Sequence, residues 1–261
     1  NYVIATNISI GGASGAYIFG GRAMNTKDGA SGADGHSDLF ARNNTVTLDN
    51  TLVQSTSTAV ADDMQIIGNF AVVSDSAPKD NGLNTLSAIG DGTTVNLSIS
   101  DSSLGYTSSG NNTATGVANL NSIAAAGVAF TDSTSSGGNV TAIRNVADIK
   151  STAATNVNFY GGLAFNGQAN SGDQAVASEN ILRLDSTSID TDTTNAASYA
   201  GNSIVGGLAQ LTKGASTANI NKASATASSN TVSVTNSEYT EAAGDLNVEA
   251  DIYGAYVDTG T

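Results

Sequence analysis

The chain has 261 residues, with 23 acidic against 9 basic side chains and a net charge of −14. Leu, Ile, Val and Phe make up only about one fifth of it, a composition close to that of disordered chains. The absence of Cys excludes disulfides and thiolate metal sites, and the few scattered basic residues exclude nucleic acid as an expected partner. No apolar run is long enough to predict membrane insertion.

A first motif consists of two apolar residues, a glycine pair and a small residue. Its clear copies start 48, 93, 45 and 48 residues apart, and the long interval contains a weaker copy, AAGVAF at 125–130, that aligns with YGGLAF at 160–165. The clear copies are IFGGRA (18–23), IIGNFA (66–71), FYGGLA (159–164), IVGGLA (204–209) and IYGAYV (252–257). A fixed spacing of this kind indicates a repeat architecture.

A second motif, rich in Asn and Thr, lies between the copies of the first. It has apolar residues at alternate positions, such as Val46 and Leu48, which is typical of a strand with one buried face. Its copies are NTVTLDNTLV (44–53), TVNLSISDSSL (94–104), NVTAIRNVADI (139–149), NILRLDSTSI (180–189) and NTVSVTNSEY (230–239). The two motifs together place one apolar strand about every 20 to 25 residues.

The alternation predicts an all-β fold: one right-handed parallel β-helix over residues 1–261. We expect about ten coils of 20 to 25 residues, in a two-coil repeat near 47 residues, which would form a rod on the order of 50 Å long. Gly permits the sharp bend in the first motif. The Asn residues that flank the second motif are expected to adopt left-handed backbone angles and to stack from coil to coil.

From about Tyr17 to Val257, the alternation of IYGG-type with NTVTLDNT-type strands resembles the passenger domains of bacterial autotransporters. The resemblance implies a secreted, extracellular β-helical protein at the bacterial cell surface, exported through an outer-membrane barrel. It also implies an adhesin or a matured surface fibre, with a host or surface ligand as partner.

The stretch KDGASGADGHSD suggests the only metal site that the sequence offers. Asp28, Asp34 and Asp38 stand among glycines and have the oxygen ligands that calcium prefers, but the stretch occurs once, whereas calcium-binding repeats act in tandem. The single histidine, His36, is not enough for most zinc sites, and no second histidine could serve as the base of a catalytic triad. We therefore expect a plain loop and no cofactor.

Paired carboxylates occur at Asp62 and Asp63 and at Asp190 and Asp192. Two carboxylates across a cleft can hydrolyse glycosidic bonds, and some polysaccharide-acting enzymes are β-helices. However, such sites also need aromatic or basic subsites for sugars, and both residue classes are sparse here. Solvated turns are the preferred interpretation, so no catalytic residue is expected.

Both ends of the chain carry strand-like segments. NISIGG contains Ile8 and Ile10, and IYGAYV contains Tyr253 and Tyr256, so these four residues are the candidates for assembly. The leading hypothesis is a non-enzymatic structural or adhesive protein of the bacterial surface. The alternative is a subunit of a filament that stacks end to end on copies of itself, and a polysaccharide-acting enzyme comes third.

Overall fold

The computed structural model describes residues 1–12, 15–25, 38–55, 64–73, 84–106, 122–131, 138–169, 172–191, 203–213, 223–241 and 251–260. These residues form strands, corners and turns but no helix, and therefore no helix that is long and apolar enough to cross a membrane.

The strands form four sheets, and every strand pair is parallel. We name the sheets A to D in the order in which the chain enters them. Sheet A consists of β1 (Tyr2–Thr6), β5 (Thr45–Asp49), β9 (Leu97–Ser100), β13 (Val146–Lys150), β17 (Ile181–Asp185) and β21 (Thr231–Thr235). Sheet B consists of β2 (Ser9–Gly12), β6 (Leu52–Ser55), β10 (Ser103–Tyr106), β14 (Ala153–Thr155), β18 (Ser188–Thr191) and β22 (Glu238–Glu241).

Sheets C and D complete the coil. Sheet C consists of β3 (Ala16–Asn25), β7 (Met64–Val73), β11 (Ile123–Thr131), β15 (Asn158–Ala169), β19 (Ser203–Lys213) and β23 (Asp251–Gly260). Sheet D consists of β4 (Asp38–Arg42), β8 (Asn84–Ile89), β12 (Gly138–Ile143), β16 (Gln174–Ser178) and β20 (Ser224–Ser228).

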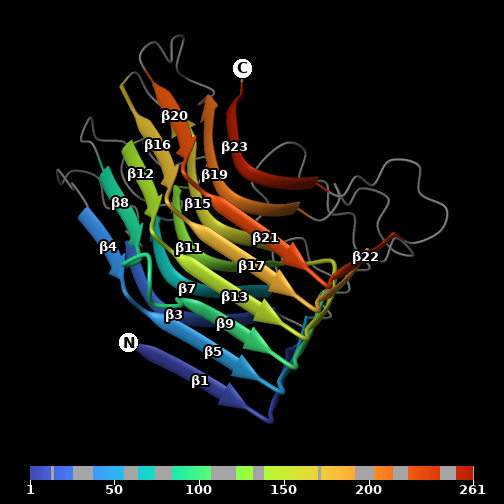
Figure 1. Cartoon of the computed structure of the whole chain (residues 1–261). Helices are drawn as coiled ribbons and strands as arrows, with labels where there is room; N and C mark the ends of the chain where they lie inside the picture. Colours follow the sequence, from blue (N-terminus) through green and yellow to red (C-terminus); the bar gives the residue numbers. More distant parts are fainter. Residues whose placement is uncertain are drawn as a thin grey trace.

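One passage through A, B, C and D is one coil, so that β1–β4 form coil 1 and β21–β23 form coil 6. Sheet A shows the successive levels from β1 to β21 (Figure 1). The predicted all-β parallel solenoid is confirmed.

The coils are about twice as long as the sequence suggested. Along sheet A, partners lie between 35 residues apart, as for Val146 and Ile181, and 51 residues apart, as for Val46 and Leu97. The repeat near 47 residues is thus one coil, because the glycine motif pairs only with itself in sheet C and four of the five Asn-rich copies lie in sheets A and B. The copy predicted at 139–149 was misaligned: its first part forms β12 of sheet D, and only its last residues form β13 of sheet A. The strand pairing therefore gives six coils in place of ten. Their stack is roughly 25 to 30 Å high rather than 50 Å. The right hand of the coil stays a prediction.

The glycine motif bends the strands of sheet C (Figure 1). A Cβ atom on its first glycine would collide with main chain: on Gly20 it would lie 2.7 Å from the carbonyl oxygen of Gly68, and on Gly161 it would lie 2.5 Å from that of Gly206. The weak copy predicted at 125–130 is a true copy, because Gly127 pairs with Gly162.

Left-handed residues form the corners on both sides of sheet A, as expected for the Asn-rich motif. The corner between A and B has Asn7, Asn50, Asp101, Ser151, Ser186 and Asn236, with φ between 46° and 56°. The corner between D and A has Asn43, Arg144, Glu179 and Ser229, with φ between 49° and 57°. In several A–B corners the next hydroxyl donates to the carbonyl oxygen two residues earlier; the Thr51 hydroxyl, for example, donates to Asp49 over 3.0 Å.

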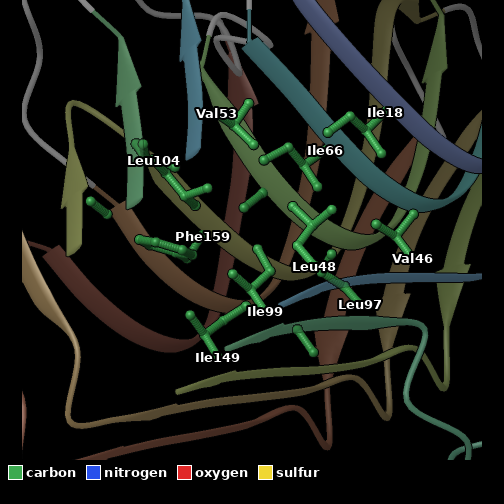
Figure 2. Close-up of a cluster of buried hydrophobic side chains, with 14 of the residues drawn as sticks. Ile18, Val46, Leu48, Val53, Ile66, Leu97, Ile99, Leu104, Ile149 and Phe159 are labelled. Carbon is green, nitrogen blue, oxygen red and sulfur yellow. The ribbon is translucent and has the colours of Figure 1, made fainter. Parts of the chain in front are cut away.

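The apolar interior is divided into two compartments. Sheets A and B and the first half of sheet C enclose large side chains, among them Leu48, Ile66, Leu97 and Phe159, which point toward one another (Figure 2). Sheet D and the second half of sheet C enclose mostly Ala. The opposite face of sheet C is also buried and apolar; there, burial raises the pKa of Tyr160 to about 12.

Candidate assembly site at the ends of the solenoid

A ladder of asparagine side chains runs along the interior from the first coil to the last. Each Nδ2 donates to the Oδ1 of the next residue over 2.9 to 3.0 Å. The members, in order, are Asn1, Asn44, Asn69, Asn145, Asn180 and Asn230. Most of them follow the left-handed residue of the D–A corner, which turns the side chain inward.

From Asn69 onward, each amide of the ladder also donates to a carbonyl oxygen of the main chain. Asn145 shows the pattern: its Nδ2 donates to the carbonyl oxygen of Ala88 over 3.0 Å, and its backbone N–H donates to the Oδ1 of Asn180 over 3.1 Å. The second glycine of the motif makes the necessary room, because a Cβ atom on Gly127 would lie 2.3 Å from the Cγ of Asn145. The two sequence motifs are therefore two halves of one packing arrangement.

One coil departs from this pattern in a compensated way. In coil 2, Asn69 stands where most of the other coils have the second glycine, and its own side chain is the ladder amide at this level. It therefore fills the position in the ladder that Asn96 of the next coil would otherwise take. Asn96 turns aside instead: its Nδ2 donates to the carbonyl oxygen of Asn44 over 3.0 Å, and its Oδ1 accepts the N–H of Val146 over 3.1 Å. A side chain at the second glycine is thus tolerated when the next asparagine changes its partners.

Coils 1 and 6 leave their strand edges and apolar side chains uncovered. Within the described ranges, every exposed large apolar side chain belongs to one of these two coils. Coil 1 contributes Tyr2, Ile4, Ile8, Tyr17, Met24 and Phe40, and coil 6 contributes Val234, Ile252, Tyr253, Tyr256 and Val257. Uncovered parallel edges of this kind are ready to pair with a further strand.

The four assembly candidates from the sequence lie on these two coils. Ile8, at the A–B corner of coil 1, is 45% exposed, and Ile10 on β2 packs partly buried against the core. Tyr253 and Tyr256 on β23 are 37% and 41% exposed, and their ring centroids are 5.1 Å apart. Because the two pairs stand at opposite ends, one chain does not bring them together.

Sequence reasoning missed other residues at the ends. Tyr2, which is 80% exposed, and Ile4 belong to β1, and the aromatic and β-branched residues of YVIAT were the signal that could have identified this strand. Arg22 stacks over the rings of Phe19 and Phe70, with its Cζ 5.2 and 5.5 Å from their centroids. This cation–π group gives coil 1 a basic residue beside its apolar edge.

The charge of the chain differs between its two ends. Residues 223–261 contain six acidic residues and no basic one, whereas residues 1–43 contain three of each. Among the residues of coil 6, Glu238 is exposed and Asp258 accepts a hydrogen bond from Gln210 over 2.9 Å. The formal charge is therefore zero over the N-terminal segment and −6 over the C-terminal one.

Of the other candidate residues, the structure describes only two. Asp28, Asp34, His36, Asp62, Asp63 and Asp192 lie outside the described residues. Asp38 begins β4 and is exposed, and Asp190 lies on β18. In the part of the chain that the structure describes, no three His, Cys, Asp or Glu side chains are grouped so that they could hold a metal ion.

Asp91 is the most strongly perturbed carboxylate of the described residues. It lies in the exposed loop between β8 and β9, where it accepts the N–H of Thr93 over 2.8 Å and that of Thr94 over 2.6 Å. These bonds and those from the two hydroxyl groups hold its pKa well below the usual range, the Thr94 hydroxyl having the largest effect. Its role is to stabilise a turn.

No protein-family model, no curated protein and no solved structure matches the chain.

Proposed function

We propose that the chain is a structural and adhesive segment of an extracellular bacterial surface protein, with a surface or host ligand and without a catalytic role. The observation that carries this proposal is the asparagine ladder, whose six members run from coil 1 to coil 6. A solenoid with such an interior holds its outer faces at fixed spacing, which suits a shaft or a binding platform. The resemblance to autotransporter passengers supports the extracellular location.

Two measurements on the native cells and the purified chain test this proposal. An antibody raised against the chain should label intact cells as strongly as permeabilised ones. Beads coated with the folded chain should adhere to host cells or to a glycan surface more than beads coated with heat-unfolded chain. Labelling only after permeabilisation, or hydrolysis of a polysaccharide by the purified chain, would contradict the proposal.

A second candidate function, a subunit of a self-assembling filament, is favoured by the exposed large apolar side chains, all of which, among the described residues, belong to coils 1 and 6. A stack of roughly 25 to 30 Å is short for a shaft, and both of its ends can accept further coils. Electron microscopy of the purified chain at micromolar concentration tests this candidate. Fibres support it, whereas isolated particles of single-chain size at every concentration contradict it.

A further inference from the structure

We propose that coil 6 of one chain docks onto coil 1 of a second copy, in the register that neighbouring coils keep within the chain. This inference rests on the second candidate function and identifies its partner and its contact residues.

The two ends match in the lengths of their edge strands. β21 and β1 have five residues each, β22 and β2 have four each, and β23 and β3 have ten each. All internal pairs are parallel and stack in columns, so a second copy that continues the columns places Tyr2 on Thr231 and Ile4 on Ser233. The junction would extend sheets A, B and C. Sheet D takes no part in this contact, because among the described residues β20 in coil 5 is its last strand.

The columns on the outer face of sheet C bring the aromatic and charged residues of the two ends together. Continuing the internal pairing places Phe19 of the second copy on Tyr253 and its Arg22 on Tyr256. The Arg22 guanidinium, which already stacks on the rings of its own chain, would gain a further ring on its open side. The acidic C-terminal segment would meet a less acidic coil 1, so charge favours head-to-tail contact over contact between like ends.

Ala255 limits how well the asparagine ladder can cross this junction. Ala255 pairs with Gly207, where a Cβ atom would lie 2.3 Å from the Cγ of Asn230. The methyl group of Ala255 therefore occupies the place into which Asn1 of the second copy would insert. Asn96 shows the solution inside the chain: the Asn1 side chain would turn aside and donate to the carbonyl oxygen of Asn230.

Cysteine cross-linking tests the register, because the chain contains no cysteine. The variant with Ile4→Cys and Ser233→Cys places the two thiols on directly paired residues of neighbouring coils, at roughly 4.8 Å between Cα atoms, within disulfide reach. The control, Tyr2→Cys with Ser233→Cys, shifts one thiol by two residues on the same face, to roughly 8 Å. Mild oxidation should give disulfide-linked multimers of the first variant and essentially none of the control.

Three outcomes would overturn the proposal, each with circular dichroism showing folded protein. The first is the absence of multimers from the in-register variant, and the second is equal cross-linking of both variants. The third is a chain that carries Ile4→Cys alone and forms disulfide-linked dimers in the same yield as the in-register variant forms multimers. Cell-surface labelling is independent of this register. If the cross-link fails while intact cells are labelled, the proposed register is rejected and the proposed surface function is not.

Substitutions at the junction test the individual contacts. Tyr256→Ser should weaken association roughly 3- to 30-fold, the range of a cation–π contact, and the double variant Tyr253→Ser and Tyr256→Ser should abolish it while the monomer stays folded. Ala255→Gly should strengthen association because the ladder can then cross the junction. Ser224→Ala on β20, which the junction leaves free, should change nothing. Unchanged association in the Tyr and Gly variants would contradict the proposed contacts.

Discussion

The substitution Asn145→Ala tests the asparagine ladder at its centre. The Asn145 side chain is fully buried and takes part in three hydrogen bonds: it accepts from Asn69 and donates to Ala88 and Asn180. After truncation, the Oδ1 of Asn180 keeps the backbone N–H of residue 145. The Nδ2 of Asn69 and the carbonyl oxygen of Ala88 each lose a partner where water has no access.

Each buried polar group that loses its partner costs about 1 to 3 kcal/mol, so the expected loss in the free energy of unfolding is about 2 to 6 kcal/mol. The matched control is Asn230→Ala at the C-terminal end of the ladder. Asn230 is only partly buried, so after its truncation water can reach the places of its three bonds: those from the backbone N–H and the Nδ2 of Asn180, and that to the carbonyl oxygen of Ala177. Its loss should therefore cost about 1 kcal/mol or less.

Urea unfolding followed by far-ultraviolet circular dichroism measures both variants against the parent chain. The reasoning would be refuted if Asn145→Ala lost less than about 1 kcal/mol, the net value of one ordinary hydrogen bond. Equal losses at the two positions would also refute it, because burial would then not determine the cost.

Three further substitutions probe the same packing. In Asn145→Asp, burial should raise the folded-state pKa of the new carboxyl above its unfolded value near 3.9. Stability should therefore be highest below about pH 3.9 and fall as the pH rises through the folded-state pKa. A urea midpoint that changes little between pH 3 and 7 would contradict this expectation. Gly162→Ala should destabilise the fold by about 1 to 3 kcal/mol, because the new Cβ would lie 2.4 Å from the Cγ of an asparagine of the ladder. Gly105→Ala, whose new Cβ would have its nearest neighbour 3.8 Å away, should change the urea midpoint little; similar midpoints for the two variants would contradict the steric reasoning. Ala255→Asn should supply a ladder amide in coil 6, as Asn69 does in coil 2, and slow amide hydrogen exchange in β21; faster exchange would argue against it.

The parallel solenoid could be predicted because two independent patterns agreed. The alternation in segments such as Val46–Leu48 indicates strands, and the spacing of the motifs indicates that like strands stack on like. The left-handed corners were also foreseeable, because Asn tolerates such angles better than most residues, and Asn43, Asn50 and Asn236 do adopt them.

The number of residues per coil could not be predicted from the alternation. Period 2 shows that a segment is a strand but not which strand lies above it, so a coil of 23 residues and one of 47 fit the sequence equally well. Most strands of sheet D were missed for a related reason: QAVAS on β16 and SATAS on β20 are too small and polar to be recognised as strands, although their alanines fill the second compartment. The exchange between Asn69 and Asn96 depends on packing between coils and has no local signature.

At the ends of the solenoid, the sequence identified the coils but not the contacts. Ile8, Ile10, Tyr253 and Tyr256 were recognisable as apolar residues in terminal strands. The partners that the internal register assigns to the two tyrosines, Phe19 and Arg22, follow only from the strand pairing. The ring pair of Tyr253 and Tyr256 likewise depends on the bend at Gly254, which brings residues three apart onto the same face.

The most direct test of end-to-end stacking is sedimentation equilibrium of the unmodified chain from low micromolar to near-millimolar concentration. If the uncovered coils stack on further copies, the weight-average mass should rise with concentration from the 25.9 kDa of one chain to multiples of it. A mass that stays at 25.9 kDa throughout, with the chain folded, would contradict the claim that these ends assemble.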